Sequence, residues 1–356
     1  MDFRKEDVLK ALSHVIEPDL KKDLVTLNMI EDLKIEGEVV SFTLVLTTPA
    51  CPLKESMKRA CIKAIHDEIS NDIVVEVTLN SRTTSGRHDN KTVLPNVKNI
   101  IGIASGKGGV GKSTVAVNLA LGLVGMGAKV GLIDADIYGP SIPIMLDLVD
   151  VKPHARQEGE TSLLIPVEKY GIKVLSIGFF VDPSQALVWR GPMAAGALKQ
   201  LITEADWGEL DYLIIDMPPG TGDIQLTLVQ TLPVTGVIIV STPQNVALAD
   251  ARKGISMFRN EGINVPVLGL IENMSYFTPM ELPDNKYYIF GKDGCKTLAE
   301  EMQVPLLGQI PLVQSICDSG DSGKPSVLEP GTPIADAFIE IGKKLVQRVS
   351  VVNSEN

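Results

Sequence analysis

The chain has 356 residues, of which 44% are hydrophobic, and a formal net charge of −11 with a pI near 5.0. That length accommodates one large and one small domain, each with a full apolar core. The acidic balance argues against broad affinity for nucleic acids, and it does not exclude a local basic patch. The first residues lack the apolar core of a signal peptide, and no apolar run is long enough to span a bilayer. We therefore expect a cytoplasmic protein that binds neither nucleic acid nor membrane.

The N-terminal part of the chain predicts a small α+β domain over residues 1–80. In chain order the expected elements are a helix over 8–16, a hairpin of strands at 33–35 and 39–46 about Gly37, a helix over 56–69 and a strand over 73–79. Residues 81–97 combine Ser, Thr, Asn, Gly and Pro with few apolar side chains, which is typical of a linker.

Cys51 stands between a strand and a helix of this module, and two interpretations are open. Pro52 suits the first position of a helix, so the Cys51 sulphur would lie at a helix N-terminus, where the thiol pKa falls. A thiolate at that place could bind or relay metal. The other interpretation is a buried small side chain, because unpaired cysteines commonly pack in cores.

The segment GKGGVGKS at 106–113 follows an apolar run at 100–104 and precedes a helical pattern. Strand, glycine-rich loop and helix is the order that a phosphate-binding loop requires, since the glycines let backbone N–H groups approach phosphate and the helix presents its positive end. Lys112 is expected to reach the β- and γ-phosphates of ATP, and the Ser113 hydroxyl to bind Mg²⁺. The residues expected to bind ATP here are Gly106, Lys107, Gly108, Gly109, Val110, Gly111, Lys112, Ser113 and Thr114.

Two later apolar runs end in aspartates: 129–133 leads into Asp134 and Asp136, and 212–215 leads into Asp216. Ligands bind beyond the carboxyl ends of parallel strands, so Asp136 and Asp216 are expected to meet Mg²⁺ and the attacking water. Taken alone, each aspartate is better explained as a helix cap or turn residue. Together with the glycine-rich loop, they favour phosphoryl transfer.

The remaining apolar runs complete an α/β domain over 98–350, followed by a short tail at 351–356. Expected strands of a mostly parallel sheet are at 100–104, 130–133, 172–177, 212–215, 236–240 and 265–271. Ile334, Phe338, Ile341 and Leu345 recur at helical spacing, which fits a closing helix packed on its own domain or an amphipathic helix on a membrane.

Six segments in this order resemble the Mrp/ApbC family of P-loop ATPases. They are GKGGVGKS, DADIYGPS at 134–141, WRGP at 189–192, DMPPGTGD at 216–223, STPQ at 241–244 and ENMSYF at 272–277, spread over about 98–345. In residues 1–80, EPDL at 17–20 and LTTPACP at 46–52 resemble the small domain of SufT-type assembly factors. The resemblance implies a MinD/ParA-like fold with a deviant Walker A loop and a task in iron–sulphur cluster assembly.

The same resemblance implies roles for single residues. Lys107 would reach across a homodimer interface to the partner's nucleotide, Asp136 would orient the hydrolytic water, Asp216 would act in the Mg²⁺ shell, and Asn273 would contact adenine. Without the resemblance, Asn273 is an ordinary turn residue at a strand end.

The chain departs from the family at the cluster site. Family members commonly carry a CxxC pair shortly after the segment matching 273–277, whereas residues 278–283 contain no cysteine. Cys61, Cys295 and Cys317 lack the spacing of a metal motif, which leaves Cys51 as the candidate iron–sulphur ligand.

The sequence therefore predicts a slow, Mg²⁺-dependent ATPase that forms a nucleotide-switched homodimer and serves iron–sulphur apoproteins or assembly factors. Two alternatives stay open: a positioning ATPase of the MinD/ParA kind, and an ATP-binding adaptor with negligible hydrolysis.

Overall fold

The computed structural model describes residues 3–86, 93–158, 161–180, 191–279, 281–282 and 284–355. The chain divides into two compact units, a small one of Met1–Gly86 with Val346–Asn356 and a large one of Arg87–Leu345. Part of the expected linker, at 87–92, and the Trp189 and Arg190 of the WRGP segment lie outside the described residues.

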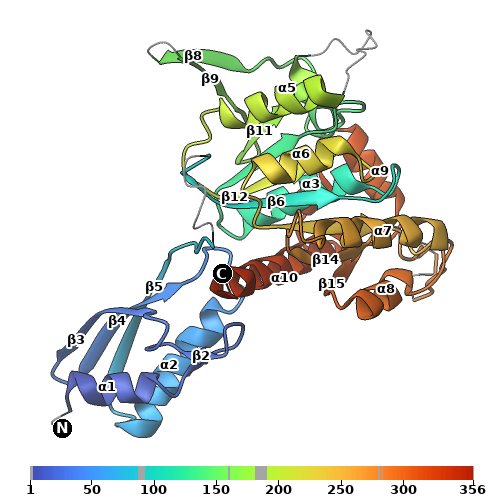
Figure 1. Ribbon diagram of the computed structural model, residues 1–356. Helices are drawn as coiled ribbons and strands as arrows, with labels where there is room; N and C mark the ends of the chain where they lie inside the picture. Colours follow the sequence, from blue (N-terminus) through green and yellow to red (C-terminus); the bar gives the residue numbers. More distant parts are fainter. Residues whose placement is uncertain are drawn as a thin grey trace. The chain divides into compact units, whose positions relative to one another are not determined.

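The small unit is a three-stranded sheet with helices packed on it (Figure 1). Its main elements are α1 (Lys5–Leu12), β3 (Ile30–Glu36), β4 (Val39–Leu46), α2 (Lys54–Glu68) and β5 (Val74–Ser81). Strand β4 pairs antiparallel with β3 and parallel with β5. Val40, Phe42 and Leu44 alternate along β4 and are buried, because one face of the sheet meets Leu12 of α1 and Ile65 of α2 in a single core.

Two elements of the small unit differ from those expected. The helix expected over 8–16 ends at Leu12, and Ile16–Glu17 (β1) instead pairs with Lys22–Asp23 (β2). Pro18 favours the extended conformation of Glu17, which fits its place in β1. The residues expected to form a tail continue the last helix, α10 (Pro333–Glu355), through Glu355. In these final turns the Gln347 Nε2 donates to Asp19 Oδ1 at 3.1 Å, a contact within the small unit.

The large unit is built on an eight-stranded sheet in the order β10-β11-β7-β12-β6-β13-β14-β15. The strands are β6 (Val97–Ala104), β7 (Val130–Asp134), β10 (Val167–Lys169), β11 (Ile172–Ser176), β12 (Leu210–Asp216), β13 (Gly236–Ser241), β14 (Val267–Glu272) and β15 (Leu306–Gln309). All neighbours are parallel except the edge strand β10, which pairs antiparallel with β11. All six runs predicted as strands are strands of this sheet, so the predicted mostly parallel α/β fold is confirmed.

Helices cover the sheet and bury most residues of its inner strands. They are α3 (Lys112–Gly125), α4 (Ile142–Met145), α5 (Gly191–Thr203), α6 (Asp223–Thr231), α7 (Asn245–Phe258), α8 (Gly294–Met302), α9 (Gln314–Asp321) and α10. Every residue of β7, β13 and β14 is buried, which explains why these strands read as unbroken apolar runs rather than as alternating ones. A hairpin of β8 (His154–Glu158) and β9 (Thr161–Ile165) extends from this body (Figure 1).

Helix α10 packs its apolar face within the protein. Phe338, Ile341 and Leu345 are at most 1% exposed, and Ile341 lies over Gly308 of β15, where a Cβ would not fit. The apolar spacing seen in the sequence is thus used for packing. Across the part of the chain that the structure describes, no helix has the length and apolarity needed to cross a membrane.

Candidate nucleotide site

The glycine-rich loop leaves the end of β6 and closes onto the first turn of α3. Gly109 and Gly111 have φ values of +80° and +81°, a left-handed conformation that favours glycine. A Cβ on Gly106 would overlap the backbone of Asp250, so the loop also runs too close to α7 for a side chain there. Ser105 fixes the entry to the loop, because its hydroxyl donates to the Lys107 carbonyl at 2.9 Å.

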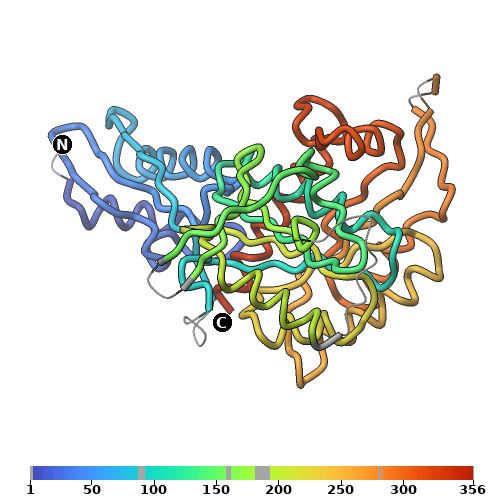
Figure 2. Tube along the Cα trace, turned by 90° about the horizontal axis from the view of Figure 1, so that it is seen from above, coloured from blue at the N-terminus to red at the C-terminus, as the bar shows by residue number. Residues whose placement is uncertain are grey.

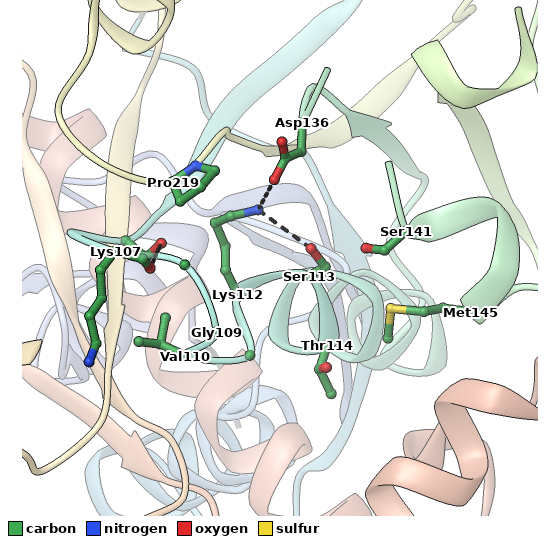
Figure 3. Close-up of a pocket in the computed structure, with 13 residues that line it drawn as sticks. Lys107, Gly109, Val110, Lys112, Ser113, Thr114, Asp136, Ser141, Met145 and Pro219 are labelled. Atoms are coloured by element: carbon green, nitrogen blue, oxygen red, sulfur yellow. Dashed lines mark hydrogen bonds and ion pairs between the residues drawn. The ribbon is translucent and has the colours of Figure 1, made fainter. Parts of the chain in front are cut away.

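Lys112, Ser113 and Asp216 converge at the base of this loop. The Lys112 Nζ lies 2.6 Å from Asp216 Oδ1 and 3.4 Å from the Ser113 hydroxyl, which itself donates to Asp216 Oδ2. The Asp136 carboxylate approaches the same ammonium group at 4.0 Å, and Figure 3 shows the three side chains of Lys112, Ser113 and Asp136 pointing toward one another. Asp216 is fully buried and Lys112 is 6% exposed, so these charges interact with little screening by water.

Two aspartates lie side by side at the ends of neighbouring strands. Asp134 of β7 is paired in register with Asp216 of β12, and both are fully buried. Burial raises the pKa of Asp134 to about 7, and the Asp216 carboxylate adds to that rise. Burial also raises the pKa of Asp216, while Lys112 and Ser113 oppose the rise. The Asp134 carboxylate accepts hydrogen bonds from the backbone N–H groups of Asp136 and Ile142 and from the Ser176 hydroxyl. These bonds hold the conformation of the loop that carries Asp136.

A cavity of about 290 Å³ lies above these groups and is lined by the glycine-rich loop, Asp136, Ser141, Met145 and Pro219. Lys107 contributes to its rim, but its side chain points away from Lys112 (Figure 3). The structure therefore brings Lys112, Ser113, Asp136 and Asp216 together and leaves Lys107 directed outward.

Asn273 ties the end of β14 to the loop. Its side-chain Nδ2 donates to the Val110 carbonyl at 2.8 Å, and its backbone N–H donates to the Ser241 carbonyl at 2.8 Å. The contact is close, because a Cβ on Gly111 would overlap the Asn273 amide nitrogen. Asn273 also lines a second, mainly apolar cavity of about 510 Å³ next to the loop, together with residues of the 311–321 segment. No sequence motif had marked that segment.

The carboxylate of Glu272, next to Asn273, organises the surrounding backbone. It is fully buried and accepts from the Ser275 hydroxyl at 2.6 Å, the Gln309 amide at 2.7 Å and the backbone N–H of Cys295 at 2.7 Å. These bonds join the ends of β14 and β15 to the start of α8. They also close the base of a long excursion, of which residues 276–279, 281–282 and 284–293 are described and project from the large unit in Figure 2.

Oxygen donors at the base of the loop fit Mg²⁺. The Ser113 hydroxyl and the Asp216 carboxylate are hydrogen-bonded to each other beside the phosphate cavity, and Mg²⁺ in such sites needs only one or two protein oxygens because phosphates and water complete its shell. A richer ligand set is not found: the described ranges contain no group of three or more His, Cys, Asp or Glu side chains able to hold a metal by themselves.

The low-pKa interpretation of Cys51 is wrong. Cys51 is 8% exposed, and burial raises the pKa of its thiol, with the carboxylates of Glu17 and Asp19 adding to the rise. Helix α2 begins only at Lys54, so the sulphur is not placed at the first turn. Desolvation therefore outweighs any benefit from the helix terminus.

The other thiols are dispersed. Cys61 and Cys295 are fully buried, burial raises the pKa of Cys61 to about 12, and burial also raises that of Cys295. Cys317 on α9 is exposed and lies 3.9 Å from an Asp321 carboxylate oxygen. Met280 and Pro283, in the stretch where the family's CxxC pair was sought, lie outside the described residues.

Comparisons with known proteins agree with this geometry. Residues 96–346 match the family model described as NUBPL iron-transfer P-loop NTPase, and residues 5–79 match that of an iron-sulfur cluster assembly protein. The chain is 49% identical over 346 residues to an iron-sulfur cluster carrier protein of Synechocystis sp., with 97% of each chain covered. It is 41% identical to the chloroplastic Fe-S cluster assembly factor HCF101 of Arabidopsis thaliana, covering 99% of this chain and 65% of that one.

A solved structure extends the comparison to the nucleotide. A nucleotide-binding protein from Archaeoglobus fulgidus in complex with ADP is 38% identical, with a TM-score of 0.59, and the match covers 68% of this chain and 94% of that chain. The two family models together span most of the sequence, and the relatives are similar over nearly its whole length. The chain belongs to the family of NUBPL-type iron-transfer P-loop NTPases, with an iron–sulphur cluster assembly domain ahead of the NTPase.

Proposed function

We propose that the protein binds and hydrolyses ATP and acts in the assembly of iron–sulphur clusters or their transfer to apoproteins. The observation that carries the nucleotide part is the convergence of Lys112, Ser113 and Asp216 beneath the glycine-rich loop. The cargo part is supported by relatives named as iron-sulfur cluster carrier and assembly proteins at 41–49% identity over nearly the whole chain.

The side chains divide the work of phosphoryl transfer. Lys112 exchanges its contact with Asp216 for the β- and γ-phosphates, and the loop amides cradle the phosphate oxygens. Ser113 and Asp216 are the residues that would hold Mg²⁺, which when bound supplies neutralising charge at the phosphates. Asp136 lies at the cavity wall and orients the attacking water. Burial raises the pKa of its carboxyl, and Lys112 opposes that rise.

We assign the second, apolar cavity to the adenine ring. Its lining combines apolar side chains of the 311–316 segment with the amide of Asn273, as a purine with a polar edge requires. The cavity shares Gly111, Thr114, Ser141 and Met145 with the phosphate cavity, so the two are adjacent in the order that one nucleotide would occupy.

Because the Lys107 side chain points away from its own phosphate cavity (Figure 3), we propose that ATP binding brings two protomers together in a closed homodimer. In this dimer Lys107 of each protomer reaches the partner's nucleotide. Light scattering of the wild type with Mg-ATP and with Mg-ADP measures the closure. We expect Lys107→Ala to remain monomeric with both nucleotides while its affinity for ADP is unchanged. Nucleotide-dependent dimers of Lys107→Ala would refute the assignment.

Phosphate release tests catalysis. Wild type is compared with Lys112→Ala and Asp136→Ala, and the exposed Lys199→Ala on α5 serves as a charge-matched control. We expect a slow wild-type rate that is retained by Lys199→Ala and lost by the other two. Equal background rates in all four proteins would indicate an adaptor that binds ATP without hydrolysing it.

Anaerobic reconstitution with iron and sulphide tests the cargo. Iron bound per protomer, visible absorbance and transfer to an iron–sulphur apoprotein are measured for wild type and Cys51→Ala. Because Cys51 is buried with a raised pKa, we expect both proteins to bind the same amount of iron. Loss of iron in Cys51→Ala would establish this residue as a ligand, and no iron in either protein would argue against cluster carriage.

A further inference from the structure

The chain between Asp216 and α6 lies directly over the start of the glycine-rich loop. The backbone N–H of Met217 donates to the Ile103 carbonyl at 3.0 Å, and that of Gly220 donates to the Ser105 carbonyl at 2.9 Å. Pro218 and Pro219, between them, have no N–H to donate. The segment is therefore attached to β6 and the loop by bonds that flank the proline pair, and Pro219 itself lines the phosphate cavity.

The Gln225 side chain attaches the proline pair to helix α6. Gln225, in the first turn of α6, is 1% exposed, and its Nε2 donates to the Pro218 carbonyl at 2.5 Å. Its other amide atom, Oε1, is buried with no hydrogen-bond partner in the described part of the chain. Burying an amide oxygen in this way has a free-energy cost, so a purely structural position would favour an apolar residue of the same size.

The backbone is a poor mechanical link between the segment and the helix. Gly220 has a φ of +93°, a Cβ on either Gly220 or Gly222 would meet only open space, and residues 221–223 are exposed. Glycines and exposed backbone yield easily to small changes of angle. In contrast, the Gln225 hydrogen bond joins Pro218 to a helix that is anchored in the core by Leu228 and Val229.

We propose that Gln225 is a positioning residue that couples the segment after Asp216 to helix α6 and transmits the movement of this segment when the nucleotide changes. A phosphate entering the cavity meets Pro219, and Pro218 moves with it because the two residues are bonded. Gln225 then carries the displacement to α6, and its unpartnered Oε1 allows the amide to take a different bond in the displaced state. This inference rests on the proposed ATP-driven switch.

The test compares Gln225→Met with Gln230→Met in the full-length protein. Methionine keeps the length and volume of glutamine without its donor, and Gln230 is an exposed glutamine on the same helix. Hydrogen exchange of the α6 amides is measured without nucleotide, with Mg-ADP and with a non-hydrolysable ATP analogue. Phosphate release gives kcat and KM for each variant.

We expect the wild type and Gln230→Met to show an analogue-dependent change in exchange over 223–231. In Gln225→Met this change falls at least threefold and kcat falls about tenfold, whereas KM stays within about twofold because the loop and Lys112 are unaltered. A role in packing alone would lower stability without separating kcat from KM. If Gln225→Met does not fold, Gln225→Leu, which also lacks the donor, carries the same expectation.

The outcomes separate this inference from the proposed function. A wild-type response that persists in Gln225→Met or Gln225→Leu, with unchanged kcat, would overturn the role of Gln225 and leave the ATPase intact. If the wild type itself shows neither nucleotide-dependent exchange in α6 nor phosphate release, both proposals fail.

Discussion

Two glycines of the phosphate loop have nearly the same backbone angles and different surroundings, so they separate backbone strain from steric overlap. Gly109 has a φ of +80° and a Cβ there would meet nothing within 4 Å. Gly111 has a φ of +81°, and its Cβ would overlap the Asn273 Nδ2 that donates to Val110. Replacing each glycine with alanine thus imposes the same strain, with a clash in one case only.

The magnitudes follow from these surroundings. A left-handed alanine costs about 1–2 kcal/mol, which is the whole expected loss of stability for Gly109→Ala. Gly111→Ala adds the lost Asn273 hydrogen bond, about 0.5–1.5 kcal/mol, and a displaced Asn273 rotamer, about 0.5–1.5 kcal/mol. We therefore expect Gly111→Ala to lose about 1–3 kcal/mol more than Gly109→Ala. In the double variant Gly111→Ala/Asn273→Ala the overlap disappears, so its cost is less than the sum of the single ones.

Urea unfolding followed by tryptophan fluorescence measures these differences in the large unit alone. The chain has two tryptophans, Trp189 and Trp207, and both fall within Arg87–Leu345. Trp207 is 2% exposed, so its emission will report loss of the core. Equal losses for Gly109→Ala and Gly111→Ala, or additive costs in the double variant, would refute the claim that Asn273 is packed against the loop.

Three further results are expected. A thiol reagent will modify Cys317 rapidly and the other three cysteines only after unfolding, because those three are buried; fast reaction of a second thiol would contradict this. The pKa of Asp134 in the folded state, about 7, lies above the ordinary value of 3.8. Between these two pH values the folded state keeps a proton that the unfolded chain has lost. The free energy of unfolding therefore falls as pH rises from about 4 to about 7, and it is level above that. Unfolding of Asp134→Asn across this range should show a smaller decline, and an unchanged slope would rule out this carboxyl as its source. Glu272→Ala leaves three donors unsatisfied and should lose about 2–4 kcal/mol in urea unfolding, whereas the exposed control Glu261→Ala stays within about 0.5 kcal/mol.

The sheet and the loop could be predicted from the sequence because both are determined locally. Strands covered on both faces are continuous apolar runs, and the phosphate loop needs its glycines, lysine and serine in one short segment. The placement of the Asp136 and Asp216 carboxylates near the loop could be predicted from sheet topology, although they are distant from the loop in sequence. Since parallel strands end at one edge of the sheet, Asp136 and Asp216 had to approach the loop wherever they lay in the chain.

What the sequence did not predict depends on burial and on distant contacts. The sequence left two interpretations of Cys51 open, a thiol of lowered pKa before a helix and a buried small side chain. The core of the small unit closes over it, and desolvation raises the pKa of its thiol. Gln225 lies just beyond a recognised motif, and its importance is visible only once its amide meets Pro218. The lining of the apolar cavity includes residues of 311–321, a segment that carries no motif and follows β15 in the chain.

The ion pair between Lys112 and Asp216 explains why phosphate binding at the loop should change the conformation of the segment after Asp216. Lys112 is bonded to a carboxylate that is fully buried, and breaking such a pair leaves an uncompensated charge in the interior. When Lys112 binds the phosphates instead, the Asp216 carboxylate loses its ion-pair partner. The segment that begins at Met217 is directly bonded to Asp216, so it is the part of the chain best placed to move in response. That segment is held by the loop backbone at Gly220 and by Gln225 at Pro218. When the Lys112 ammonium group changes its partner from Asp216 to phosphate, the backbone of residues 217–220 therefore shifts, and Gln225 passes this shift to helix α6.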